Sequence, residues 1–345
     1  MSTAPVDTAR PVAAAPDAHD GVVGFAGRAL GSSLKLFVRT PPGSEGAATT
    51  SEPRQAWAVV QAEFAAVGAA LSRFREDSEL TGLNRLAGTG GVALVSWRLR
   101  TMLAAVHRAG CLTGGRFEAS VVDVLEDLGE HGATLAGPDP ARPRRGDRAA
   151  LVAPGTPRAS LVQIPSRPLD SGGIGKGLAL RWAAAAAIAM LPPGSGILVD
   201  AGGDIMSAGA PPFGGWRIGV DDPVAPPGVA APPLAVYAMV DGGVSTSSVA
   251  VRNWTGPDGR RVHHLVDPAT RAPARTGLMA VSVAGPDPAW NEVWSKALFL
   301  GGTESIGEEA RRRGMAAWWV DARGRLGMTP EARVRSVWVA EERVG

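Results

Sequence analysis

The chain has 345 residues, 45% of them apolar, which is enough for one large core or two fused lobes. Its 35 basic and 33 acidic residues leave a formal charge of +2, too balanced to indicate a protein that binds nucleic acid or a membrane surface. The single cysteine, Cys111, excludes an intrachain disulfide, and we expect it to be buried as a small hydrophobe. No Cys/His cluster offers a zinc site, so the expected partner is a small or medium-sized ligand.

The start of the chain differs in composition from the rest. Residues 1–20 are rich in Ala and Pro and lack the basic and then apolar pattern of a secretory signal, so we expect a disordered arm before a domain at 21–345. No stretch is apolar enough to span a bilayer, because the alanine-rich run at 182–191 has the length of a buried helix. The sequence therefore predicts a cytoplasmic protein without membrane insertion.

The apolar pattern predicts many short strands mixed with about five helices, which is typical of an α+β fold with mixed or antiparallel sheets packed against helices. In chain order we expect a strand at 25–39, a helix at 56–71, a turn at 75–78, helices at 96–113 and 118–128, a surface loop at 132–155, a glycine-rich turn at 169–177, a helix at 178–190, strands at 197–199, 205–208, 216–220, 235–240, 264–266 and 280–284, a helix at 290–300, and strands at 316–320 and 334–339. No internal repeat is evident.

The glycine-rich turn, LDSGGIGKG at 169–177, places four glycines and a lysine in front of a helix. Backbone N–H groups approach a ligand closely where side chains are missing, and a helix N-terminus attracts negative charge, so the turn predicts an anion site. Tight-turn geometry alone also accounts for the glycines, and Asp170 could cap the helix. The chain has only three lysines, Lys35, Lys176 and Lys296, while the other 32 basic residues are arginines, so we single out the last two as sites that need a compact ammonium.

Three more polar clusters each have a plain structural interpretation, and two of them also suit a functional role. The glycine pair at 202–203, with an acid on each side, is typical of a hairpin turn. The hydroxyls at 245–248, followed by Arg252, suit phosphate binding or a plain Ser/Thr turn. His264, the second of two adjacent histidines, could take a proton from an attacking hydroxyl, or it could belong to a surface pair, and Asp267 follows three residues later.

Seven segments decide between these interpretations by their order along the chain. They are LGS at 30–32, SRFREDSEL at 72–80 with a downstream Leu-Asn, GRFE at 115–118, LDSGGIGKG at 169–177, ILVDAGGDIMSAG at 197–209, WRIGVDDP at 216–223 and HLVDPATRAP at 264–273. In order and spacing they resemble the ApbE-like flavin transferases, the FAD:protein FMN transferase family, from about residue 29 to about residue 302. These enzymes use FAD to attach FMN to a hydroxyl of a partner protein.

The resemblance implies a two-lobed, tunnelling-fold-like architecture, FAD as substrate, Mg²⁺ as cofactor, and an acceptor protein whose FMN-binding domain carries the target Thr or Ser. It places at the FAD site Leu30, Phe74, Arg116, Phe117, Glu118, Asp170, Lys176 and Val266. The implied metal ligands are the carbonyl of Gly173 and the side chain of Glu292. We expect His264 or Asp267 to take the hydroxyl proton, and Lys176 and Lys296 to bind the diphosphate.

The helix NEVWSKA at 291–297 departs from the family pattern, because Glu292 and Lys296 stand where the family has a metal-binding Asp and Thr. A glutamate can still ligate magnesium, but a protonated lysine has only donors. Either the metal shifts, or Lys296 itself supplies positive charge to the diphosphate. Two other functions therefore stay open beside transfer: a catalytically silent FAD-binding homologue, and a pyrophosphatase that converts FAD to FMN and AMP.

Overall fold

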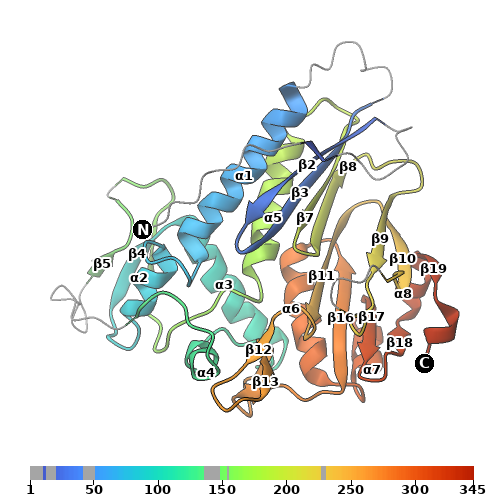
Figure 1. Cartoon of the computed structure of the whole chain (residues 1–345). Helices are drawn as coiled ribbons and strands as arrows, with labels where there is room; N and C mark the ends of the chain where they lie inside the picture. Colours follow the sequence, from blue (N-terminus) through green and yellow to red (C-terminus); the bar gives the residue numbers. More distant parts are fainter. Residues whose placement is uncertain (1–10, 13–20, 42–50, 136–147, 154, 227–230) are drawn as a thin grey trace.

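The computed structural model describes residues 11–12, 21–41, 51–135, 148–153, 155–226 and 231–345 (Figure 1). Nearly all of the predicted N-terminal arm and the centre of the predicted 132–155 loop lie outside these residues. Within them, no helix is both long and apolar enough to cross a bilayer.

An antiparallel sheet of nine strands forms the centre of the described structure. Its order is β1 (Pro11–Val12), β2 (Val22–Ala29), β3 (Ser32–Arg39), β7 (Gly196–Ala201), β8 (Asp204–Gly209), β11 (Gly242–Ser248), β16 (Leu278–Gly285), β17 (Ala316–Asp321) and β18 (Leu326–Met328). Alternate residues of a strand face opposite sides of a sheet, so Ile197 and Val199 pack on one face and Leu198 on the other.

The two faces of this sheet are covered by different layers (Figure 1). One face packs against three helices, α1 (Ser51–Leu71), α5 (Gly175–Ile188) and α6 (Pro288–Gly301). The other packs against a smaller antiparallel sheet of β9 (Trp216–Val220), β10 (Ala235–Met239) and β19 (Ser336–Val339), through Tyr237 stacked on Trp318. Two short helices complete this lobe. α7 (Ile306–Arg312) packs against α6, and α8 (Pro330–Arg335) packs against β17 and the smaller sheet.

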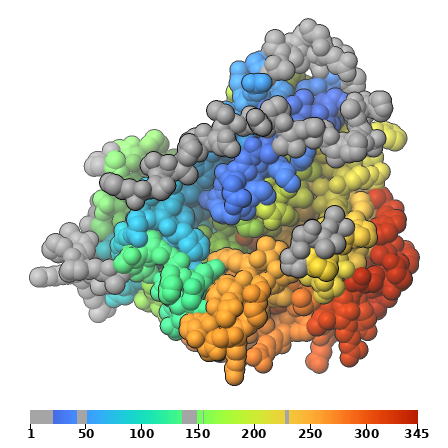
Figure 2. All heavy atoms as spheres, viewed as in Figure 1, coloured from blue at the N-terminus to red at the C-terminus, as the bar shows by residue number. Residues whose placement is uncertain are grey.

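A smaller lobe lies on the outer side of α1, at the left of Figure 1. It contains α2 (Glu79–Arg85), α3 (Trp97–Leu112), α4 (Val122–Asp127) and a three-stranded sheet of β5 (Arg148–Ala150), β4 (Val92–Val95) and β6 (Ser160–Gln163). Two hairpins, β12 (Asn253–Thr255) with β13 (Arg261–His263) and β14 (Val266–Asp267) with β15 (Ala272–Pro273), reach back from the main sheet toward it. Figure 2 shows this orange segment against the green segment around α4, where the indole N–H of Trp254 donates to the carbonyl of Leu128.

The predicted α+β class and antiparallel pairing are confirmed, but several local predictions were wrong. The strand expected at 25–39 is a hairpin, β2 and β3, that turns at Leu30 and Gly31 with φ of 47° and 77°. A leucine seldom adopts positive φ, so the sequence carries no turn signal there. The glycine pair at 202–203 is the predicted hairpin turn, between β7 and β8. The hydroxyls at 245–248 lie inside β11 and form no turn.

Other boundaries also shift. The helix expected at 118–128 is confined to α4, and the strand expected at 264–266 begins only at Val266, because His264 precedes β14. The first residues of the strand expected at 334–339 belong to α8. Cys111, predicted to be buried, is exposed near the end of α3, on the side of that helix that faces away from the core.

Candidate functional site

A pocket lies between the two lobes. Its walls come from the segment before α4, the glycine-rich turn before α5, helix α6, and the chain on either side of the β12–β13 hairpin. The residues that line it are Phe117, Glu118, Val121, Leu125, Asp170, Gly172, Gly173, Arg252, His264 and Lys296. Six of the residues predicted from the sequence are among them: Phe117, Glu118, Asp170, Gly173, His264 and Lys296.

The glycine-rich turn is fixed by contacts with α1 and α2. The Asn84 side chain both donates to and accepts from the backbone of Leu169, at 2.8 Å each way, and the hydroxyl of Ser171 donates to the carbonyl of Leu71. The first N–H groups of α5 are already used, since Ile174 and Gly175 both donate to the carbonyl of Ser171. The anion cradle expected at this helix start therefore has few free donors, and side-chain cations carry the positive charge of the pocket instead.

Asp170 does not cap α5, because the residue at the N-cap is Ile174. Its carboxylate accepts instead from the backbone N–H of Gly172 and from Arg73. Burial by itself would raise the pKa of Asp170, but the charges of Arg73 and Arg252 outweigh it and lower that pKa below its usual value. Asp170 is therefore a buried carboxylate held ionised by two arginines.

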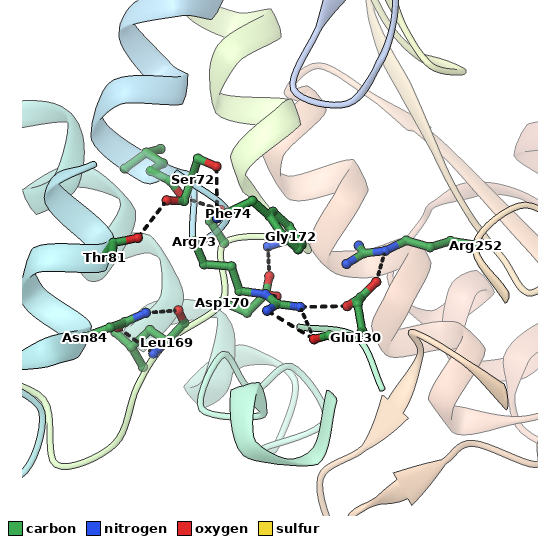
Figure 3. A network of polar contacts seen from close by, with 12 residues as sticks. Ser72, Arg73, Phe74, Thr81, Asn84, Glu130, Leu169, Asp170, Gly172 and Arg252 are labelled. Atoms are coloured by element: carbon green, nitrogen blue, oxygen red, sulfur yellow. Dashed lines mark hydrogen bonds and ion pairs between the residues drawn. The ribbon is translucent and has the colours of Figure 1, made fainter. Parts of the chain in front are cut away.

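A row of alternating charges runs from this carboxylate across the pocket wall (Figure 3). The Nε of Arg73, a side chain only 3% exposed, lies 2.5 Å from Asp170, and its NH2 lies 2.7 Å from Glu130. The other oxygen of Glu130 lies 2.6 Å from the Nε of Arg252. The row begins at a buried acid and ends at a cation that faces the pocket.

A second row of alternating charges lies between α5, α6 and β8. Lys176 forms an ion pair with Asp204, and Glu292 accepts from the backbone N–H of Gly177 at 2.8 Å. Burial and the nearby Asp204 raise the pKa of Glu292 to about 7, against the opposite effect of Lys176 and Lys296. Burial also lowers the pKa of Lys296, although Asp170 and Glu292 oppose it. This row too ends at a cation that faces the pocket.

Lys296 differs from the other cations of the site in having no acidic partner among the described residues. Over the described ranges, no acid forms an ion pair with its ammonium group. The Nζ lies against the backbone of Gly173, only 2.6 Å from where a Cβ on that glycine would be, and 5.7 Å from the centre of the Phe117 ring. An ammonium group with unused donors in a pocket wall is suited to binding an anion.

His264 supplies the only imidazole among the residues that line the pocket. Its Nδ1 lies 3.1 Å from the backbone carbonyl of Arg252. A carbonyl only accepts, so Nδ1 carries the hydrogen and Nε2 keeps a free lone pair. Burial, assisted by the charges of Arg252 and Lys296, lowers the pKa of His264 to about 3, so the ring is neutral and is a weak base in the unliganded pocket.

Several predicted site residues lie outside the pocket wall. Arg116 is engaged by Glu309, at 2.7 and 2.5 Å, and by the carbonyl of Ala297. The carboxylate of Asp267 accepts from the backbone of Ala269 and the hydroxyl of Thr270 within its own turn. Lys176, predicted to bind the diphosphate, is held by Asp204 and does not line the pocket.

Three predicted apolar residues surround the pocket at a greater distance. Val266 packs with Val124 and Leu125 under α4. Leu30, at the tip of the β2–β3 hairpin, lies beside α1. Phe74 is 54% exposed, and the guanidinium groups of Arg73 and Arg252 lie 4.3 and 5.9 Å from the centre of its ring.

The sequence indicated only some members of the first row of charges, which runs from Asp170 to Arg252. Arg73 belongs to the recognised SRFREDSEL segment, and Arg252 follows the hydroxyl cluster that suits phosphate. No sequence pattern indicated that Glu130 belongs to the site, because it is 122 residues from Arg252 in the chain and pairs with it only in the folded structure.

Magnesium in proteins requires several oxygen ligands. Here one predicted ligand, Glu292, already accepts from a backbone N–H, and the ammonium group of Lys296 lies against the other, Gly173. No group of three or more acidic, histidine or cysteine side chains within the described part of the chain could hold a metal ion. These residues do not fit a magnesium ion.

Comparison with known proteins now identifies the family. The ApbE family model matches residues 31–319. The chain belongs to the ApbE family. The FAD:protein FMN transferase of Klebsiella pneumoniae (strain 342) is 29% identical over 294 residues, which cover 80% of each chain, and that of Salmonella typhimurium is 28% identical over 269 residues, 74% of this chain and 73% of that protein.

Solved structures of the ApbE family share the fold. The crystal structure of the ApbE protein of Thermotoga maritima superposes with a TM-score of 0.72 at 22% identity and covers 92% of this chain and 100% of that one. The apo form of the Pseudomonas stutzeri flavinyl transferase ApbE gives 0.69 at 23% identity, over 91% and 96% of the two chains. These similarities confirm the two-lobed α+β fold that the resemblance implied.

Proposed function

We propose that this protein is an FAD:protein FMN transferase. It takes FAD, attaches FMN through a phosphoester to a Thr or Ser hydroxyl in the FMN-binding domain of an acceptor protein, and releases AMP. The names of its relatives support this function, and one structural observation carries it: two cations, Arg252 and Lys296, share a pocket with a neutral histidine whose Nε2 is free. Cytoplasmic residence stays a prediction.

FAD contacts the pocket residues in this proposal. The diphosphate lies at Arg252 and Lys296, while Phe117 and Glu118 border the flavin nucleotide. The other predicted FAD-site residues, Leu30, Phe74, Arg116, Asp170, Lys176 and Val266, form the rim or support these walls. Lys176 acts through Asp204 and Glu292, and Arg116 acts by holding the end of α6 through Ala297.

The transfer step balances without any further reactant. The acceptor hydroxyl oxygen attacks the phosphorus of the FMN half, the bond from that phosphorus to the bridging oxygen breaks, and AMP leaves with the bridging oxygen. The hydroxyl proton passes to Nε2 of His264, and Arg252 and Lys296 stabilise the charge that develops on the phosphate oxygens. Burial is the main cause of the lowered pKa of His264, and the bound diphosphate offsets the further effect of Arg252 and Lys296, so the imidazole is a stronger base in the complex than in the empty pocket.

Transfer is tested by incubating the protein with FAD and a purified FMN-binding acceptor domain. Intact-mass measurement should show the acceptor gaining one FMN, and chromatography should show an equal amount of AMP. His264→Asn should slow the reaction by about 10²–10⁴-fold, the usual contribution of a general base. His263→Asn is the matched control, because that neighbouring ring contacts Ala274 and does not line the pocket.

Two other outcomes would replace the proposal. Free FMN and AMP without a modified acceptor would identify a pyrophosphatase that uses water as the nucleophile. Intact FAD, recovered from the protein after denaturation with neither product formed, would identify a catalytically silent FAD-binding protein.

A further inference from the structure

We infer that Arg252 and Lys296 form a metal-independent clamp for the FAD diphosphate, in which Glu130 is the positioning residue that directs Arg252 into the pocket. This inference rests on the proposed function, because it takes FAD as the ligand. It assigns to two side chains the charge neutralisation that the family resemblance assigned to magnesium.

Lys296 brings a cation to the glycine that was predicted to ligate the metal. Its Nζ lies 2.6 Å from where a Cβ on Gly173 would be. The carboxylates of Asp170 and Glu292 act on it electrostatically, but within the resolved ranges neither forms an ion pair with it. These two carboxylates offset only part of the desolvation cost of the buried ammonium, and a phosphate oxygen bound directly to it would offset more.

Arg252 presents the second cation. Its Nε donates to Glu130 at 2.6 Å, and no hydrogen bond from its two terminal nitrogens occurs in the described structure. Its NH1 lies 3.5 Å from where a Cβ on Gly172 would be, so the free end of the guanidinium reaches the glycine-rich turn. A guanidinium fork of this kind matches two phosphate oxygens.

Glu130 fixes the direction of that fork. Its two carboxylate oxygens hold two different arginines, Arg252 through one and the buried Arg73 through the other (Figure 3). Arg73 is itself anchored by Asp170, so Glu130 cannot follow Arg252 if that side chain swings. Glu130 does not line the pocket, and its effect on FAD therefore passes through Arg252.

The pocket supplies two cations for the two negative charges of the FAD diphosphate. They come from separate elements, Arg252 beside β12 and Lys296 on α6. Two acids, Glu118 and Asp170, line the same pocket, and Asp170 is already paired with the buried Arg73. Arg252 and Lys296 are therefore the groups that can contact the diphosphate without a divalent ion.

The test measures FAD affinity without an acceptor protein, by flavin fluorescence, in EDTA and in excess Mg²⁺. We expect the wild-type Kd to agree within about twofold between the two conditions. Lys296→Met and Arg252→Met should each weaken FAD binding by about 10- to 100-fold, the range expected for a hydrogen bond to a charged group. Their affinity for riboflavin, which lacks phosphate, should stay within about threefold. Lys35→Met is the matched control, because that lysine lies on β3 and pairs with Asp200 outside the pocket.

Glu130→Gln tests the positioning role, since glutamine keeps the shape and loses the charge. We expect FAD affinity to fall by about 10-fold while riboflavin affinity is unchanged. In the Arg252→Met background the same substitution should have no further effect on FAD affinity, because Glu130 acts through Arg252. A purely structural role would weaken both ligands and would add to the Arg252→Met effect.

The inference would be overturned if the wild-type protein lost FAD affinity in EDTA and regained it in Mg²⁺. This measurement uses only the wild-type protein, so it does not depend on whether a variant folds. Unchanged FAD affinity in Lys296→Met would overturn it as well. Metal-independent FAD binding without transfer to an acceptor would leave the clamp standing and refute the proposed function. Transfer of FMN to an acceptor, combined with FAD binding that requires Mg²⁺, would refute the clamp and leave the proposed function standing.

Discussion

Arg73 is the side chain whose loss should damage this fold most clearly. It is 3% exposed, it reaches Asp170 and Glu130 with separate nitrogens, and it also donates to the carbonyl of Glu130. Arg73→Met keeps most of the volume of the side chain but leaves two acids at the pocket without this partner. Removing one member of a buried ion pair costs about 3–5 kcal/mol, because the remaining charge stays buried and uncompensated. We expect a loss of that size at pH 7.

Urea unfolding followed by tryptophan fluorescence measures this loss. The loss should stay nearly constant down to about pH 4 and shrink below it. The charge of Arg73 lowers the pKa of Asp170 in the folded protein, against the effect of burial, so the stabilisation is present above the ordinary pKa of an aspartate and is lost as the pH falls through the lowered pKa.

Arg75→Met is the matched control for this prediction. Arg75 belongs to the same turn and pairs with Asp77, but both side chains are largely exposed, so its loss should cost less than about 1 kcal/mol. A loss below about 1 kcal/mol in Arg73→Met, or one that grows as the pH falls, would refute the reasoning.

Three further predictions concern the core, the surface and pH. Gly177→Ala should destabilise the protein by about 1–3 kcal/mol in the same urea assay, because a Cβ there would lie 2.6 Å from the backbone nitrogen of Ala289, where α5 meets α6. Cys111 is exposed, so a thiol reagent should label it stoichiometrically in the folded protein, whereas labelling only after unfolding would contradict its placement on α3. His264 has a lowered pKa of about 3 in the folded protein, so its contribution to stability is complete above about pH 6.5 and is lost as the pH falls toward 3. His264→Asn should therefore lose less stability than the wild type between pH 7 and pH 4, and equal slopes would contradict the buried neutral ring.

Local features of this protein were predictable from sequence because they depend on residues close together in the chain. The three- and four-residue spacing of Trp57, Val60 and Phe64 predicts α1, and all three side chains are buried on its inner side. The glycine pair at 202–203 predicts the β7–β8 turn, because glycine adopts positive φ without strain. The order of the motifs gave the family, and thereby the fold and the pocket residues Phe117, Glu118 and Asp170.

The charge pattern of the pocket was decided by tertiary structure alone. Glu130 meets Arg252 and Arg116 meets Glu309 only after packing brings segments 122 and 193 residues apart into contact. The same packing pairs Arg116 with Glu309 and, in the part of the chain that the structure describes, leaves Lys296 without an ion pair. No local sequence pattern predicts this difference. Whether a charged side chain is used or free depends on which distant acids lie around it, and the hydrophobic core sets that arrangement.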